Sequence, residues 1–204
     1  PSGYLLNSTE DSGIEARLDQ EIPLLIGFDL IKAEKDDALL PKKEEMLAAI
    51  SNQQVVSDYV NTIGNELRKK HFNFVLGPSL DLYYNDFNPF TEEHSFSDTT
   101  SVVITYASTF VNAMKSCGVL TVAGSFPGIG NMERGYSTQP PIVFSRETQL
   151  YKQDLAPFKA LVNQGLQSIL MSNASIPAID SNGQLMASKS VKVHTALREE
   201  LGFN

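Results

Sequence analysis

A glycine-rich loop follows an apolar run in residues 120–131, LTVAGSFPGIGN. Loops at the end of a buried strand are common places for catalytic or binding groups. Gly128 and Gly130 lack the third glycine of a dinucleotide fingerprint, and the loop lacks the lysine of a phosphate-binding loop. No Gly-x-Ser-x-Gly pattern of a serine hydrolase surrounds Ser125. The sequence therefore predicts a loop that keeps its shape but lacks the side chains for these chemistries.

Carboxylates near the predicted strand ends are the next candidates for chemistry. Asp81 follows an apolar run, and we expect it to have a framework role. Glu133 lies just after the glycine loop, and its pattern favours a solvated loop carboxylate over a general acid. The sequence predicts no catalytic residue within this chain.

Histidines and cysteines give no pattern of a metal site. His71, His94 and His194 are far apart, without an i, i+4 pair or a flanking carboxylate pattern, so we expect no metal and no other cofactor. Cys117 is the only cysteine, which excludes an internal disulfide bond and favours a small apolar residue at a helix end.

Composition limits the classes of partner. The 204 residues are 42% hydrophobic and 20% charged, as expected for one globular domain. The net charge of -8 disfavours binding to nucleic acid, which requires clustered Lys and Arg. No apolar run approaches the roughly 20 residues of a transmembrane helix. The first residues lack the pattern of a signal peptide, and the sequence assigns no compartment.

Apolar runs alternate with segments of helical periodicity, as in strand–helix units around a parallel sheet. The predicted strands are residues 3–6, 23–29, 72–82, 118–123 and 166–172. The predicted helices are residues 13–20, 53–70, 99–117, a bent helix capped by Ser145 that resumes at Pro157, and 188–201. Residues 32–43 are charged and poorly patterned. About five units predict an α/β fold without deciding between an open sheet and a barrel, which needs eight.

The order of these segments resembles the N-terminal barrel domain of glycoside hydrolase family 3, particularly its bacterial β-N-acetylhexosaminidase branch. Residues 118–131, GVLTVAGSFPGIGN, are similar to Gly-Val-Leu-Ala-Val-Ala-Lys-His-Phe-Pro-Gly-His-Gly-Asp. Residues 23–29 (PLLIGFD), 73–82 (NFVLGPSLDL) and 144–180 also resemble family segments. The resemblance implies a TIM (β/α)8-type barrel, incomplete here, with residues 1–204 as one domain that lacks the C-terminal part with the nucleophile strand.

The departures from the family pattern fall in the glycine loop. The Lys-His pair that helps to hold the sugar in the family corresponds to Gly124 and Ser125. The later His of the motif is Ile129, and its final Asp is Asn131. The loop resembles the family motif with its sugar-binding side chains replaced.

The remaining functional positions implied by the resemblance are also changed. The family's sugar-binding Arg before Ser-Phe-Gly is His94, which either donates a weak hydrogen bond to a sugar or faces water. Residues 131–142 hold neither member of the Asp-x-His acid/base pair. The nucleophile would lie beyond Asn204. Only Asp29 matches a sugar contact residue by residue, so the resemblance gives Asp29, His94, Ser125 and Asn131 as substrate-binding candidates.

Three functions stay open from the sequence. The first is a degenerate relative that has lost catalysis and acts as a binding or structural module, with an amino sugar, another domain or a second copy of the chain as partner. The second is a working β-N-acetylhexosaminidase with a diverged acid/base arrangement; a retaining glycosidase commonly needs two carboxylates about 5 Å apart. The third is an unrelated α/β binding protein.

Overall fold

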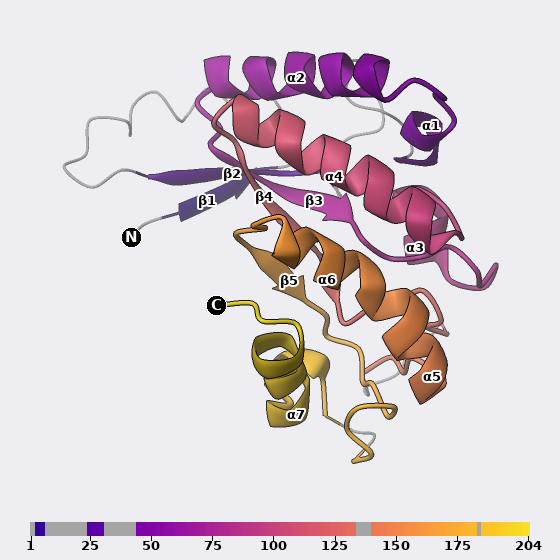
Figure 1. The fold of residues 1–204 in the computed structure, drawn as a ribbon. Coiled ribbons are helices and arrows are strands. Elements are labelled where there is room, and N and C mark those ends of the chain that lie inside the picture. Colours follow the sequence, from indigo (N-terminus) through magenta and orange to yellow (C-terminus); the bar gives the residue numbers. More distant parts are fainter. Residues whose placement is uncertain (1–2, 7–23, 31–43, 134–139, 183–184) are drawn as a thin grey trace.

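Five parallel strands form one curled sheet in the computed structural model of the chain (Figure 1). The structure describes residues 3–6, 24–30, 44–133, 140–182 and 185–204. The strands follow one another in chain order as β1 (Gly3–Leu6), β2 (Leu25–Asp29), β3 (Phe74–Ser79), β4 (Leu120–Phe126) and β5 (Ile169–Met171). Because every neighbouring pair is parallel, the carboxyl ends of all five strands lie at one edge of the sheet.

The described helices follow β2, β3, β4 and β5. The regular ones are α1 (Glu44–Ala48), α2 (Gln53–Lys69), α3 (Pro89–His94), α4 (Thr100–Ser116), α5 (Glu147–Gln149), α6 (Leu155–Asn163) and α7 (Val191–Thr195). Three further turns are the π-helical η2 (Leu150–Asp154), the 3-10 turn η3 (Ala187–Lys189) and the π-helical η4 (Ala196–Glu200). None of the described helices is long and apolar enough to span a bilayer.

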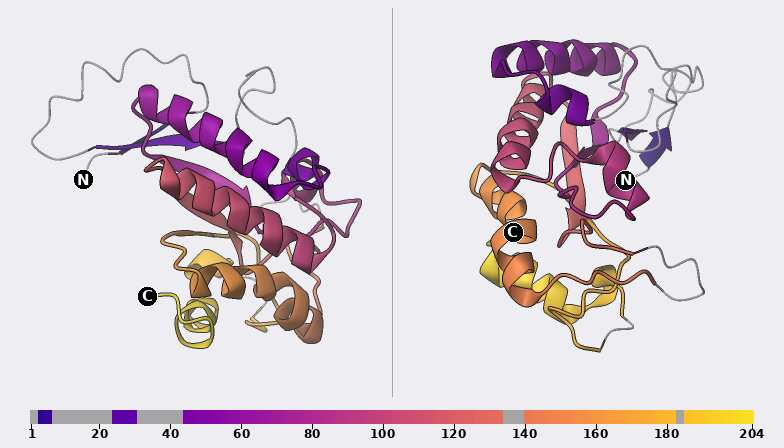
Figure 2. Two further views of the ribbon diagram at one scale, coloured as in Figure 1. Left: turned by 45° about the horizontal axis from the view of Figure 1, so that its top comes forward. Right: turned by 90° about the vertical axis from the view of Figure 1, so that its right-hand side faces the viewer.

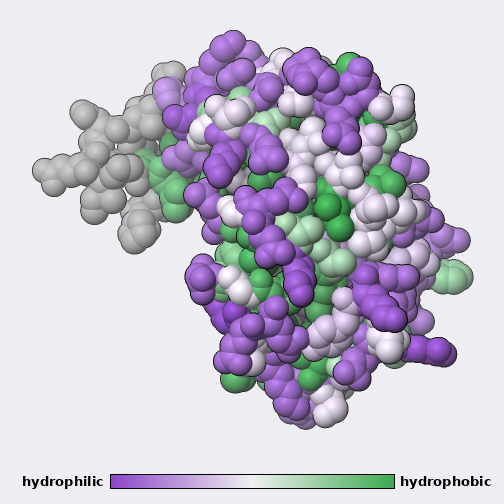
Figure 3. Space-filling view, viewed as in Figure 1, coloured by the Kyte–Doolittle hydropathy of each residue, from purple (hydrophilic) through white to green (hydrophobic). Residues whose placement is uncertain are grey.

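The long helices cover one face of the sheet. Figure 2 shows α2, α4 and α6 side by side on this face, with α3 toward the opposite side. The outward surface of this helix layer is largely hydrophilic over α2, and hydrophobic residues show among hydrophilic ones nearer its middle (Figure 3). The architecture is an α/β barrel-type fold in which the described residues supply five strands, against eight in a closed barrel.

The core forms where apolar strand residues meet the helix layer. In α2 the buried side chains of Val56, Val60 and Ile63 recur at helical spacing, which fixes the face that packs on the sheet. Phe126 of β4 meets Phe158 of α6 edge to face, with ring centroids 5.2 Å apart. Edge-to-face aromatic pairs of this kind help to fix the helix against the strand.

All five predicted strands are present, but β4 is longer than predicted. Its strand pairing continues through Gly124, which pairs with Ser79, to Phe126, which pairs with Met171. The sequence pattern placed the loop from Gly124 onward because glycine and proline interrupt the apolar run. Neighbouring strands on both sides hold this segment extended.

Two predicted helix starts are wrong. Ser145 does not cap the helix that follows it, because its hydroxyl donates to Asp154 at 3.0 Å and Arg146 takes the cap position. The last helix starts after Ser190, whose hydroxyl accepts the amide of Val193 at 3.3 Å. The predicted resumption at Pro157 falls inside α6, which begins at Leu155 directly after the π-helical turn η2. The predicted helix at 13–20 and the unpatterned stretch 32–43 lie outside the described residues.

Candidate functional site

The four candidate binding residues lie on segments at the carboxyl ends of the strands. Asp29 is the buried last residue of β2, and Ser125 is half-buried near the end of β4. His94 ends α3, in the connection between β3 and α4, and Asn131 is half-buried just after the glycine loop. In parallel α/β folds this end of the sheet carries the binding and catalytic groups. The placement agrees with a site at this edge and leaves the role of each residue a prediction.

The carboxylate of Asp81 binds backbone amides of the glycine loop, residues 124–131. Its side chain is 4% exposed. One carboxylate oxygen accepts the amide of Ile129 at 2.8 Å, and the other accepts the amide of Ser125 at 2.9 Å. The hydroxyl of Ser79 donates to the second oxygen at 3.2 Å. These contacts are those of a framework residue, since the carboxylate is occupied by the protein itself.

Asn88 holds the same loop from the side of α3. Its side-chain amide donates to the carbonyl of Ile129 at 2.6 Å and to that of Gly130 at 3.2 Å. Asn85, three residues earlier, makes a longer contact of 3.4 Å to the carbonyl of Met132. The backbone of the loop is therefore held by side chains from two separate segments.

A second buried carboxylate lies under Gly128. Asp154 of η2 accepts hydrogen bonds from the hydroxyls of Tyr84 and Ser145. Gly128 has a φ of 117°, and a Cβ at this position would lie 2.8 Å from the Cβ of Asp154. A residue without a side chain is required here for both reasons. Asp154, held by Tyr84 and Ser145, thus packs directly against the turn of the loop at Gly128.

Burial raises the pKa of both carboxylates. The pKa of Asp81 rises to about 6 because the group has lost its solvation, which outweighs the hydrogen bonds that favour its charged form. The pKa of Asp154 rises to about 6 for the same reason, against the hydrogen bonds from Tyr84 and Ser145. Glu44 accepts the amide of Ser79 at 3.2 Å, and burial raises its pKa well above the ordinary value. All three carboxylates accept hydrogen bonds from groups of the protein itself.

Gly124 has no room for a side chain. A Cβ there would lie 2.8 Å from the Cβ of Leu170 on β5 and 3.3 Å from its carbonyl oxygen. The peptide bond from Gly124 to Ser125 is cis, as is that from Phe126 to Pro127. A long side chain at position 124 would have to displace the backbone of the neighbouring strand, so this wall of the site is closed.

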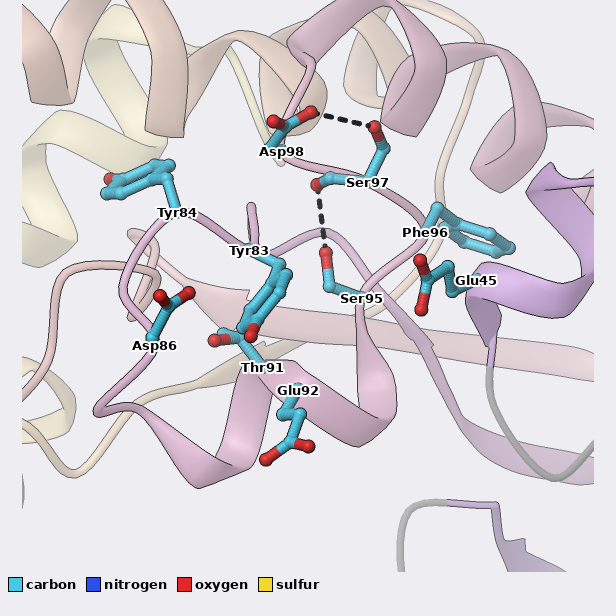
Figure 4. Close-up of a pocket in the computed structure, with 10 residues that line it drawn as sticks. All are labelled: Glu45, Tyr83, Tyr84, Asp86, Thr91, Glu92, Ser95, Phe96, Ser97 and Asp98. Carbon is cyan, nitrogen blue, oxygen red and sulfur yellow. Dashed lines mark hydrogen bonds between the residues drawn. The ribbon is translucent and has the colours of Figure 1, made fainter.

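A separate pocket opens between α1, α3 and the start of α4 (Figure 4). Its volume is about 510 Å³. Figure 4 shows the ring of Tyr83 beside Asp86 and Thr91, with Tyr84 turned away from it. The lining residues in the described part of the chain do not include the four candidates; they are Glu45, Tyr83, Tyr84, Asp86, Thr91, Glu92, Ser95, Phe96, Ser97 and Asp98.

Metal-binding geometry is absent from the part of the chain that the structure describes, where no group of three His, Cys, Asp or Glu could hold an ion. His71 follows α2 with a φ of 69°, and His194 is exposed on α7. Cys117 is half-buried at the end of α4, where its sulfur lies 3.5 Å from the carbonyl oxygen of Asn61.

Comparison with known proteins decides the family. Residues 8–204 match the glycosyl hydrolase family 3 N-terminal domain. The chain belongs to glycoside hydrolase family 3. The family match covers the glycine loop, both buried carboxylates and all four candidate binding residues.

Relatives in family 3 agree with this assignment. A beta-hexosaminidase of Psychromonas ingrahamii is 28% identical over 142 residues, which is 69% of this chain and 41% of that protein. The fold of a Paenibacillus family 3 beta-N-acetylglucosaminidase matches with a TM-score of 0.83 and 24% identity over 99% of this chain and 41% of that one. The chain spans less than half the length of either relative.

A third relative carries a ligand. NagZ from Neisseria gonorrhoeae, solved with N-trifluoroacetyl-D-glucosamine, matches with a TM-score of 0.80 and 18% identity over 93% of this chain and 58% of that one. These likenesses to solved structures show the family 3 fold.

The sequence pattern did not reveal the residues that brace the loop. Tyr84 carries no motif that separates it from an ordinary loop residue. The patterns at Asn88 and Ser145 are typical of helix starts and do not indicate their contacts to the loop and to Asp154. Asp154 did carry a signal, because it lies four residues after Leu150 and four before Phe158, which are both buried. A carboxylate on an apolar helix face predicts a buried polar contact.

Proposed function

We propose that this family 3 domain no longer hydrolyses glycosides and acts as a binding or structural module whose ligand is an amino sugar. Gly124 carries the proposal. The family resemblance expects a sugar-holding Lys there, whereas a Cβ on Gly124 would already lie 2.8 Å from the Cβ of Leu170. In this chain such a side chain does not fit without a shift of Leu170 on β5.

The other loop positions support the same proposal. Ser125 and Asn131 replace the His and Asp of the family motif, and residues 131–142 contain neither Asp nor His. Two carboxylates near the loop, Asp81 and Asp154, are buried and accept hydrogen bonds from backbone amides and hydroxyls of the protein.

The amino sugar is chosen from the names of the relatives, which are hexosaminidases and N-acetylglucosaminidases. Asp29 supports a retained ligand, because it keeps the family's residue at the carboxyl end of β2. The names of the relatives and the retained Asp29 also favour the alternative, an active β-N-acetylhexosaminidase with a diverged acid/base group. The experiment must therefore separate binding from turnover.

Turnover of a chromogenic N-acetyl-β-glucosaminide by the full-length protein at high concentration tests the proposal. We expect no turnover above that of an Asp29→Ala variant, together with weak binding of N-acetylglucosamine that the variant loses. Turnover that falls in Asp29→Ala would establish the alternative and overturn the proposal.

A further inference from the structure

Asn88 lies between the two segments that carry candidate binding residues. It directly precedes α3, which ends at His94, and it faces the glycine loop that leads to Asn131. Its side chain is fully buried, at 0% exposure. Both ends of the side-chain amide are used, since the nitrogen donates to the loop and the oxygen accepts the amide of Phe90 at 3.2 Å.

Asn88 and Asp81 both bind the backbone of Ile129 in the glycine loop. Ile129 donates its amide to Asp81 at 2.8 Å, and its carbonyl accepts from Asn88 at 2.6 Å. The peptide groups on both sides of Ile129 are therefore held by buried partners. A buried carbonyl that loses its donor costs about 1–3 kcal/mol, so the loop has a strong preference for this position.

Helix α3 is tied to the same framework at its far end. Ser95, the residue after His94, donates its hydroxyl to the carbonyl of Asp81 at 2.6 Å. At the near end, Asn88 caps the helix and Thr91 donates to the Asn88 carbonyl at 3.3 Å. Both ends of α3, which carries His94, are therefore bonded to residues that also hold the glycine loop.

We propose that Asn88 is a positioning residue that sets the spacing between His94 and the glycine loop, and thereby the affinity of the site for an amino sugar. The inference rests on the proposed function for its ligand. It does not depend on hydrolysis, because Asn88 acts on the backbone of the loop and on the cap of α3.

Asn88→Asp separates the two contacts of the side chain. The variant keeps the oxygen that caps α3 but loses the donor to the carbonyls of Ile129 and Gly130. At pH 7 a carboxylate would face two carbonyl oxygens, and the spacing would change. Once protonated, the carboxyl group can again donate one hydrogen bond to the loop. Asn85→Asp is a matched control, since Asn85 also accepts a nearby amide and makes only a 3.4 Å contact to Met132.

The measurement is the dissociation constant of N-acetylglucosamine at pH 7 and pH 4.5, each compared with wild type at the same pH because Asp81 and Asp154 titrate in this range. We expect Asn88→Asp to weaken binding about tenfold at pH 7 and to regain most of that loss at pH 4.5. Asn85→Asp should stay within about threefold of wild type at both pH values. Asn88→Ser is the second variant if Asn88→Asp does not fold, and its loss should not recover at low pH.

Two results would overturn the inference. One is an Asn88→Asp protein that is folded and binds the sugar as well as Asn85→Asp does at pH 7. The other is found by NMR and hydrogen exchange if wild type binds no N-acetylglucosamine, a finding that by itself refutes only the proposed ligand.

The ring resonances of His94 and the amide exchange of Ile129 then test the positioning role. We expect both signals to change in Asn88→Asp or Asn88→Ser and to stay the same in Asn85→Asp. Unchanged signals in the Asn88 variants would refute the positioning role.

Discussion

The carboxylate of Asp81 accepts the backbone amide of Ile129 at 2.8 Å, across 48 residues of sequence. The contact joins the end of β3 to the turn after β4, and the amide of Ser125 joins it at 2.9 Å. The glycine loop is thus held in part by a residue that follows a different strand.

Asp81→Ala should lower the free energy of unfolding by about 2–4 kcal/mol, because two amides and a hydroxyl lose their acceptor in a buried place. Urea denaturation at pH 7 measures the effect. Asp86→Ala is the control, since Asp86 is exposed, and it should stay within about 0.5 kcal/mol of wild type. Equal effects of the two variants would contradict the framework role of Asp81.

The stability of the protein should fall as the pH rises from 4 to 6. Asp81 and Asp154 have pKa values raised from 3.8 to about 6, so the folded state keeps protons that the unfolded state has released. The contribution of these two groups to stability is then largest below pH 4 and is lost up to about pH 6, where the effect levels off. Urea denaturation between pH 4 and 7 measures this trend.

Asp154→Asn should reduce this pH dependence. The variant cannot ionise at position 154. Its amide oxygen can still accept from Tyr84, and its amide nitrogen, in place of the second oxygen, can donate to the hydroxyl of Ser145. Relative to wild type, its free energy of unfolding should improve by about 2–3 kcal/mol between pH 4 and pH 7, from a shift of about 2 pKa units. Parallel stability curves for the two proteins would refute a raised pKa for Asp154.

Tyr84→Phe should raise the pKa of Asp154 further, because the hydroxyl of Tyr84 stabilises the charged carboxylate. A carbon-13 NMR titration of the carboxyl group follows the shift directly. We also expect a loss of about 1 kcal/mol in unfolding free energy at pH 7. Tyr83→Phe leaves this contact untouched, and an equal shift in that control would count against the assignment.

Gly124→Ala should destabilise the protein by about 1–3 kcal/mol, because the added methyl group meets the Cβ of Leu170 at 2.8 Å. Thermal and urea denaturation measure the loss. Ser125→Ala, one residue away and half-buried, should have little effect because its backbone contact to Asp81 is retained. A Gly124→Ala protein as stable as wild type would mean that β5 shifts easily to admit a methyl group. This would weaken the argument that Gly124 has no room for a side chain.

The sequence predicts the fold well wherever burial alone decides. Every strand and the long helices α2 and α4 follow from apolar spacing, as with Val56 and Val60 on α2. The pattern missed α3, although Asn88 followed by Pro89 is a regular start signal for a helix. It is only six residues long, too short to show a period.

The candidate site is less accessible to sequence reasoning. Asp81 was expected to be a framework residue, and its contacts agree with that role. The partnership of Asp154 with Tyr84 joins residues 70 positions apart, and no local pattern encodes such a contact. The prediction that Ser145 caps a helix is wrong because the carboxylate of Asp154, nine residues later, takes the hydroxyl.

The two side chains that hold the glycine loop, those of Asp81 and Asn88, bind its backbone atoms. The path of the loop is therefore separate from the side chains that the loop presents. Ser125 and Asn131, the candidate binding positions, contribute no side chain to these contacts. A substitution of either side chain therefore leaves the path of the loop in place. The same separation makes this loop a suitable scaffold for grafting new side chains by directed evolution.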